Sequence, residues 1–142
     1  MSGDPPSVQR SFRLSARTLE LLDAEAEMAG ESRNALADRL LGEALRVERH
    51  PLIRFHQGAA GRRRPVVTGT RLAVDQVVAT LRGSDGDVDE AAAYLEISAR
   101  QVKAALDYYA DFPDEIEGDA AVAERIEAAE RDRWERQQRA LA

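Results

Sequence analysis

The sequence predicts a mainly α-helical protein of two small domains followed by a long, charged C-terminal helix, and three observations carry this prediction. Apolar residues recur at helical spacing over most of the chain, with glycine or proline where each run stops. Aromatic residues make up only 5% of the composition, so the core must be built mainly from aliphatic side chains, which suits helices. His50-Pro51 marks a boundary, and residues 52–72 beyond it are poor in helix signals.

Composition and charge narrow the class of protein. The 142 residues contain no cysteine, which excludes disulfide scaffolds, thiolate zinc sites and cysteine nucleophiles. No apolar run approaches the ~20 residues of a membrane span, so we expect a cytoplasmic protein without a membrane partner. The net charge of −6 is unevenly distributed, with −3 over residues 1–45, +6 over 46–84 and −9 over 85–142. The basic middle is compatible with a phosphate-binding surface or, equally, with a solvated loop.

Residues 8–14 alternate in the manner of a half-buried β-strand. One predicted face carries Val8, Arg10, Phe12 and Leu14, and the other carries Gln9, Ser11 and Arg13. Ser15 is placed to cap a helix over 17–29, which Gly30 should end, and Ser32 is placed to cap a second helix. A single strand cannot pair its own backbone groups, so we expect it to pair with the same strand of a second copy.

This strand with its two helices resembles the ribbon-helix-helix repressors and antitoxins over residues 8–47, and we assign residues 7–49 to such a domain. The resemblance implies a homodimer whose two-stranded ribbon enters the major groove of operator DNA. Gln9, Ser11 and Arg13 would then face the bases, with Arg13 best suited to guanine, while the amides at Ser32, Arg33 and Asn34 would hold a phosphate. Arg10 departs from the family pattern, because it falls on the inward face. A ribbon used only for dimerisation is the alternative.

A second motif, Pro-Val-Val-x-Gly-Thr-Arg-Leu-x-Val, occupies residues 65–74 and begins with a short predicted strand. Helices are expected from Asp75 to Gly83, over 89–94 and, after Ser98, over 99–110. The segment resembles the domain-of-unknown-function 433 family, found in VapB-like antitoxins, over residues 51–115. We assign 51–117 to a small helix-turn-helix-like (winged-helix-like) domain, which reads DNA or serves as a protein scaffold.

Within this domain the sequence suggests which side chains are buried and which are exposed. On the last helix we expect a core-facing set of Val102, Ala105, Leu106 and Tyr109, and an outward set of Arg100, Gln101, Lys103 and Asp107. Gly69 is expected in a tight turn whose backbone geometry requires a glycine, and Arg71 is expected to form an ion pair with Asp89 or Glu90. Arg62, Arg63 and Arg64 are expected to be exposed, either solvated or in contact with DNA phosphates.

Residues 119–142 form the third predicted part, a highly charged helix over about 119–139 with few apolar positions. Antitoxins of the type resembled here wrap a toxin with a C-terminal segment, often a PIN-like ribonuclease with a magnesium site. The resemblance therefore implies that Ile126, Arg131, Arg133, Trp134 and Arg136 contact a cognate toxin, with Trp134 as anchor. Packing of this helix on its own dimer is the alternative.

Catalysis is not expected. His50 and His56 lack an accompanying acid–base pattern, no glycine-rich phosphate loop occurs, and residues 85–90 lack the spacing of a calcium loop. We therefore expect no catalytic residue, metal or cofactor. The sequence predicts a type II antitoxin that represses its own operon, and the alternative is a dimeric adaptor or regulator that does not read DNA.

Overall fold

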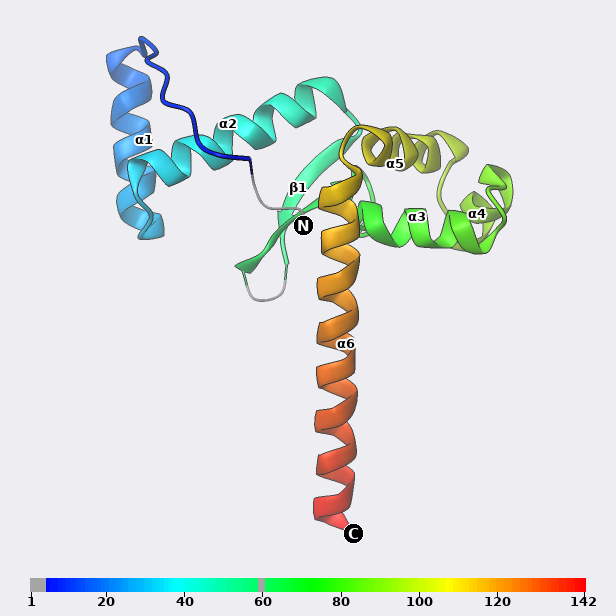
Figure 1. Cartoon of the computed structure of the whole chain (residues 1–142). Helices are drawn as coiled ribbons and strands as arrows, with labels where there is room; N and C mark the ends of the chain where they lie inside the picture. Colours follow the sequence, from blue (N-terminus) through cyan, green and yellow to red (C-terminus); the bar gives the residue numbers. More distant parts are fainter. Residues whose placement is uncertain (1–4, 59–60) are drawn as a thin grey trace. The chain divides into compact units, whose positions relative to one another are not determined.

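The structure is a computed structural model that describes residues 5–58 and 61–142. In that part of the chain it is mainly α-helical, with six helices and one two-stranded antiparallel sheet (Figure 1). The chain divides into two compact units, residues 1–49 and residues 50–142, which are described separately below.

The first unit contains α1 (Ala16–Ala29) and α2 (Arg33–Arg49), and local chemistry sets where each helix begins. Ser15 Oγ accepts a hydrogen bond from the Thr18 amide, and Ser32 Oγ accepts one from the Ala35 amide, both at 3.1 Å. Gly30 ends α1 in the left-handed conformation, with a φ of +65° that a side chain would oppose. The caps predicted at these positions are therefore confirmed.

Residues 5–15 carry no strand in the single chain, although residues 8–14 were predicted to form one. The physical reason is that a strand needs a hydrogen-bonded partner, and the described chain offers none beside this segment. Ser15, where the segment meets α1, is extended, with a φ of −63° and a ψ of 152°. Pairing with a second copy remains a prediction.

The second unit begins with a hairpin of β1 (Ile53–Gln57) and β2 (Arg63–Val67). The strands pair in register from Ile53 opposite Val67 to Gln57 opposite Arg63. Ile53, Val66 and Val67 are buried. The strand at β2 was predicted two residues later, whereas β1 was not predicted. Five residues with two apolar positions give too little periodicity to distinguish a strand from a loop.

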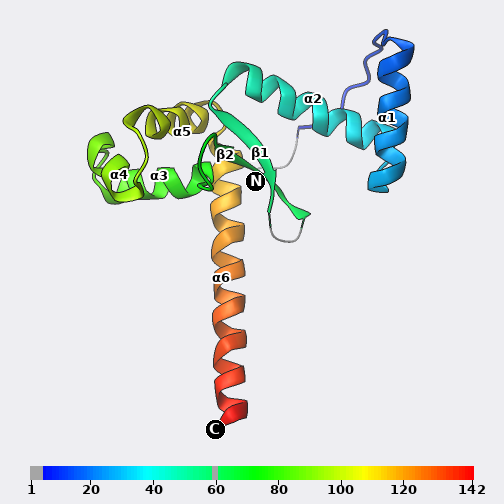
Figure 2. The same ribbon diagram turned by 180° about the vertical axis from the view of Figure 1, so that it is seen from behind.

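Three short helices, α3 (Val74–Gly83), α4 (Val88–Leu95) and α5 (Ala99–Asp111), pack together beside the hairpin (Figures 1 and 2). Helix α5 begins after Ser98 as predicted, and Ser98 and Gln101 form a capping box there. Asp87 caps α4 by accepting from the Glu90 amide at 3.1 Å. The buried core consists of aliphatic side chains and one tyrosine, among them Ile53, Val67, Val77, Val102, Tyr108 and Ile116.

The expected buried face of α5 is partly wrong. Val102 and Ala105 are fully buried, but the third core residue is Tyr108, while Tyr109 is only partly buried and Leu106 is 39% exposed. The hairpin causes this difference, because it covers the side of α5 that carries Tyr108. The Tyr108 ring makes edge contacts with His50 and Phe55, at centroid distances of 5.1 and 6.5 Å, and lies 4.8 Å from Phe112.

The last helix, α6 (Pro113–Leu141), begins earlier than the predicted start near 119. Phe112 and Pro113 end α5 as expected, but Pro113 also occupies the first turn of α6, where its missing N–H costs nothing. Ile116 and Asp119 are buried, whereas every side chain from Glu127 onward is exposed. Both views show this second half extending beyond the rest of its unit (Figures 1 and 2).

The core position of Tyr108 predicts a large difference between two tyrosine variants. Tyr108→Ala should lower the free energy of unfolding by about 3–5 kcal/mol, because it leaves a cavity among His50, Phe55 and Phe112. Tyr94→Ala, at a position 79% exposed, should change it by less than about 0.5 kcal/mol. Urea denaturation of both variants measures this. Similar effects would contradict the assignment of Tyr108 as the centre of the core.

Candidate functional site

An apolar groove of about 510 Å³ runs over the first unit, between residues 12–14 and the two helices. Its apolar lining is Phe12, Leu14, Leu21, Leu22, Ala37, Leu40 and Leu41. Among the described residues of this unit only Ala26 and Leu36 are buried. Two helices with so small a core are short of burial, since a stable domain must bury far more apolar surface. The groove is therefore an apolar surface that the described part of this unit leaves exposed.

The alternation predicted for residues 8–14 corresponds to a real separation of side chains. Phe12 and Leu14 line the groove, whereas Gln9, Ser11 and Arg13 are exposed and do not line it. Arg10 is not a groove residue either, and its guanidinium donates to the neighbouring Gln9 carbonyl at 3.3 Å. The position that departs from the family pattern thus keeps its charge in solvent.

The predicted phosphate anchor lies at the start of α2. Arg33 and Asn34 occupy its first turn, where backbone N–H groups have no carbonyl to bind within the helix. Ser32 is occupied in capping, and the Arg33 guanidinium pairs with Asp23 of α1 at 2.6 Å. The groups at the start of α2 that could bind an anion are therefore the backbone amides of Arg33 and Asn34.

Arg62 and Arg64 do not form the exposed basic surface that was expected. Arg62 pairs with Asp119 of α6 at 2.7 Å, and Arg64 pairs with Asp75 of α3 at 2.5 Å. Both carboxylates are almost entirely buried, with side-chain exposures of 10% and 6%. Arg63 is half-buried. Arg62, just before β2, and Arg64, within it, therefore tie the hairpin to two helices whose buried acids need a counter-charge.

Asp119 carries the clearest electrostatic perturbation in this cluster. Burial raises the pKa of its carboxyl above the ordinary value of 3.8, and the positive charge of Arg62 opposes that effect. At the surface of the same unit, Glu117 accepts hydrogen bonds from Tyr109 and Arg82 at 2.6 and 2.7 Å. These bonds lower the pKa of Glu117 and raise the pKa of Tyr109. Tyr109, expected in the core, thus contributes its hydroxyl to a surface network.

The outward face of α5 is less suited to reading bases than the sequence suggested. Arg100, Lys103 and Asp107 are exposed as expected. Gln101 is occupied, because its side chain completes the Ser98 cap and donates to the Thr68 carbonyl at 3.1 Å. Gly69, with a φ of +83°, provides the turn geometry predicted for it.

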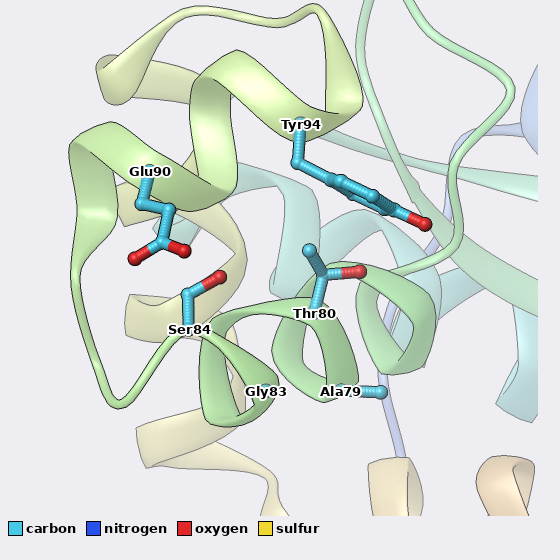
Figure 3. A pocket seen from close by; sticks show the side chains of 6 residues that line it. All are labelled: Ala79, Thr80, Gly83, Ser84, Glu90 and Tyr94. Atoms are coloured by element: carbon cyan, nitrogen blue, oxygen red, sulfur yellow. The ribbon is translucent and has the colours of Figure 1, made fainter.

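Arg71 does not pair with Asp89 or Glu90 as expected. Its side chain is exposed and forms no ion pair with any described residue, and Glu90 forms none either. This leaves Glu90 at the edge of an open pocket of about 510 Å³ between α3 and α4, which sequence analysis missed (Figure 3). Ala79, Thr80, Gly83, Ser84 and Tyr94 complete its lining.

The residues predicted to contact a toxin fall into two groups. Ile126 is half-buried and lines a small hollow together with Arg62 and Asp119, so it belongs to the packing of α6 on its own unit. Arg131, Arg133, Trp134 and Arg136 lie on the exposed half of α6, where Trp134 is 60% exposed. Arg136 makes a 3.6 Å surface pair with Asp132, one turn away.

Comparison with known proteins bears on the second unit. Residues 61–109 match the model of a family described as a protein of unknown function, DUF433. The match confirms the family resemblance of this segment, over a shorter span than the expected 51–115. It covers β2, α3 and α4 and most of α5, so the pocket between α3 and α4 lies wholly within the DUF433 segment. No curated protein and no solved structure was found to match the chain.

The described residues contain neither a membrane-spanning helix nor a cluster of metal ligands. None of the helices there is both long and apolar enough to cross a membrane. In the same residues no three acidic or histidine side chains come together as ligands for a metal ion.

The buried acid in α6 predicts a specific dependence of stability on pH. Because the folded-state pKa of Asp119 is raised, the folded chain binds this proton more tightly than the unfolded chain does. The contribution of Asp119 to the free energy of unfolding is therefore lost as the pH rises from about 3.8 through the folded-state pKa of this carboxyl. Relative to wild type, Asp119→Asn should gain stability over that range, as measured by urea denaturation at several pH values.

Glu117→Gln provides a control of opposite sign. The pKa of Glu117 is lowered, so its contribution is present above the ordinary value of 4.5 and is lost as the pH falls through the folded-state pKa. The two variants should give difference curves of opposite slope. Curves of the same slope would show that burial does not dominate at Asp119.

Proposed function

We propose that the chain is a dimeric DNA-binding regulator, acting as an antitoxin that represses its own operon. The observation that carries the DNA-binding part is the separation of side chains in residues 8–14. Phe12 and Leu14 line an apolar groove of the first unit, while Gln9, Ser11 and Arg13 are left in solvent. An extended segment of this kind has one face for a protein core and one face for a ligand.

Dimerisation follows because the first unit leaves large apolar side chains exposed in the single chain. Phe12, Leu40 and Leu41 are 74%, 44% and 53% exposed. Fully burying one such side chain stabilises a protein by about 1.5–3 kcal/mol. Antiparallel pairing of residues 8–14 with a second copy would hydrogen-bond the backbone of both segments and cover both grooves. A homodimer is therefore the state that supplies the missing core.

Paired segments form a two-stranded ribbon, and a ribbon of this size fits the major groove of DNA. Gln9, Ser11 and Arg13 would then face base edges, with Arg13 placed to donate two hydrogen bonds to guanine. The amides at Arg33 and Asn34 would bind a backbone phosphate and set the register on the duplex. Arg62 and Arg64 are not included in this interface, because they already neutralise buried acids.

The antitoxin part of the proposal rests on family resemblance and on the exposed half of α6. This half contains Arg131, Arg133, Trp134 and Arg136, and it makes no contact that would bury Trp134. An exposed tryptophan among arginines is a suitable anchor for a protein partner with an acidic pocket. A PIN-like ribonuclease, whose site holds magnesium with acidic residues, is the proposed toxin.

Substituting Arg13 tests DNA reading. Arg13→Ala should weaken binding to the chain's own promoter region by roughly tenfold or more at ~150 mM salt, because a bidentate contact to guanine is lost. A band-shift assay with promoter and unrelated DNA measures this. Arg17→Ala is the matched control, since Arg17 is an exposed arginine on α1 that lies outside the predicted reading face.

The dimer must be intact for this comparison, which sedimentation of each variant establishes. If Arg13→Ala and Arg17→Ala bind promoter DNA as tightly as wild type, the ribbon does not read bases. The adaptor alternative, in which the segment only dimerises, then replaces the DNA-binding proposal.

Removing the exposed half of α6 tests the antitoxin role. A chain lacking residues 127–142 should lose its ability to relieve the toxicity of a small ribonuclease-like protein encoded by an adjacent reading frame. It should still bind promoter DNA, because residues 113–126 retain their packing on the second unit. Trp134→Ala in the full chain should weaken relief in the same co-expression assay. Full relief by both variants would exclude this helix as the toxin contact.

A further inference from the structure

The pocket between α3 and α4 is built from two pairs of residues one helical turn apart. Thr80 comes from α3 and Ser84 is the residue that caps its end, while Glu90 and Tyr94 come from α4 (Figure 3). The floor is hollow because Ala79 and Gly83 carry little or no side chain. A Cβ added to Gly83 would meet no atom within 4 Å, so the open space reaches the α3 backbone. The resulting volume of about 510 Å³ accommodates a small organic group.

Three polar or aromatic groups in this pocket have no partner in the described chain. Ser84 is nine-tenths buried, yet its hydroxyl forms no hydrogen bond with any described residue. Its side chain points into the pocket, as does the Glu90 carboxylate, which has no ion pair (Figure 3). The ring of Tyr94 is 79% exposed and lies over the Thr80 side of the hollow (Figure 3). Although the residue as a whole is largely buried, the Ser84 hydroxyl opens onto the pocket with its donor and acceptor unused, so a polar group entering the pocket could bind it.

Glu90 is the charged side chain in the lining of the pocket, and the chain segment that contains it is acidic. Residues 84–98 contain five acidic side chains and no basic one, and the acids are Asp85, Asp87, Asp89, Glu90 and Glu96. The nearest arginine in sequence, Arg82, binds Glu117 and Tyr109 and is therefore engaged elsewhere. A concave surface lined by one sign of charge concentrates ions of the opposite sign. The Glu90 carboxylate and its acidic flanks therefore favour a cationic ligand over an anionic one.

We propose that this pocket binds an alkylguanidinium group. A guanidinium is planar, so it can donate to the Glu90 carboxylate and to Ser84 Oγ while it stacks on the Tyr94 ring. Its apolar stem would lie over Ala79 and Gly83, which offer no competing side chain. The source is either an arginine side chain presented by a partner protein or a free small guanidine such as agmatine. This proposal does not depend on DNA binding by the first unit.

Amide NMR of the full chain tests the chemistry with a pair of probes of similar shape. Ethylguanidinium should cause saturable shifts at the amides of Thr80, Gly83, Ser84, Glu90 and Tyr94, whereas ethylurea, which is neutral, should cause none. Equal responses to the two probes would overturn the proposal. So would ethylguanidinium shifts spread evenly over all the acidic residues of the chain, because these would show an atmosphere of counter-ions without a site.

Three variants locate the binding site. Glu90→Gln should weaken ethylguanidinium binding by roughly fivefold or more, because it removes a charge-assisted contact. Asp89→Asn, on the same helix but outside the lining, should leave it within about twofold. Ala79→Leu should fill the exposed floor and prevent binding without disturbing the core. Wild-type affinity in Glu90→Gln, or an equal loss in Asp89→Asn, would overturn the assignment.

Competition experiments distinguish the two sources. Agmatine and a peptide of residues 127–142, which contains Arg131, Arg133, Arg136 and Arg139, are each added to the ethylguanidinium complex. Displacement by agmatine at lower concentration identifies a free guanidine. Displacement by the peptide at lower concentration identifies an arginine side chain, with the exposed half of α6 from a second copy as one source. Failure of both to displace the probe would overturn the proposal.

Discussion

Burial of Tyr108 is the interaction on which the second unit depends. Its ring lies among His50, Phe55 and Phe112, which come from the start of the unit, from β1 and from the junction of α5 with α6. Its hydroxyl donates to Glu115 at 3.1 Å, so the polar end is also satisfied. One side chain thus connects the hairpin to both helices in a core that is otherwise aliphatic.

The two units differ in whether they can bury their own apolar side chains. Residues 50–142 close a core around Tyr108, and two arginine–aspartate pairs, from Arg62 and Arg64, attach the hairpin to α6 and α3. The described part of the first unit buries Ala26 and Leu36 and exposes a groove lined by leucines and Phe12. This difference is the physical basis for proposing that self-association belongs to the first unit, while the second unit carries surface chemistry on a fold that is already complete.

The arginine–aspartate ion pairs change how the charge distribution along the chain is interpreted. Part of the positive charge of residues 46–84 is neutralised within the protein, because Arg62 forms an ion pair with Asp119 and Arg64 forms one with Asp75. The acidic residues of 85–96 form no ion pair with any described residue, and one of them, Glu90, lines a pocket together with an unpartnered serine. Net charge over a segment therefore says little about its partners, because pairing removes some charges from the surface and leaves others to act at a distance.

Features that depend on local chemistry can be predicted from the amino-acid sequence. Helix starts at Ser15, Ser32 and Ser98, the stop at Gly30 and the turn at Gly69 all follow from bonds between residues close in the chain. Only the tertiary structure decided which face of α5 is buried, where Arg62 and Arg64 find their partners, and that small residues of α3 leave a pocket beside α4. These depend on contacts between residues far apart in sequence, which no local period encodes.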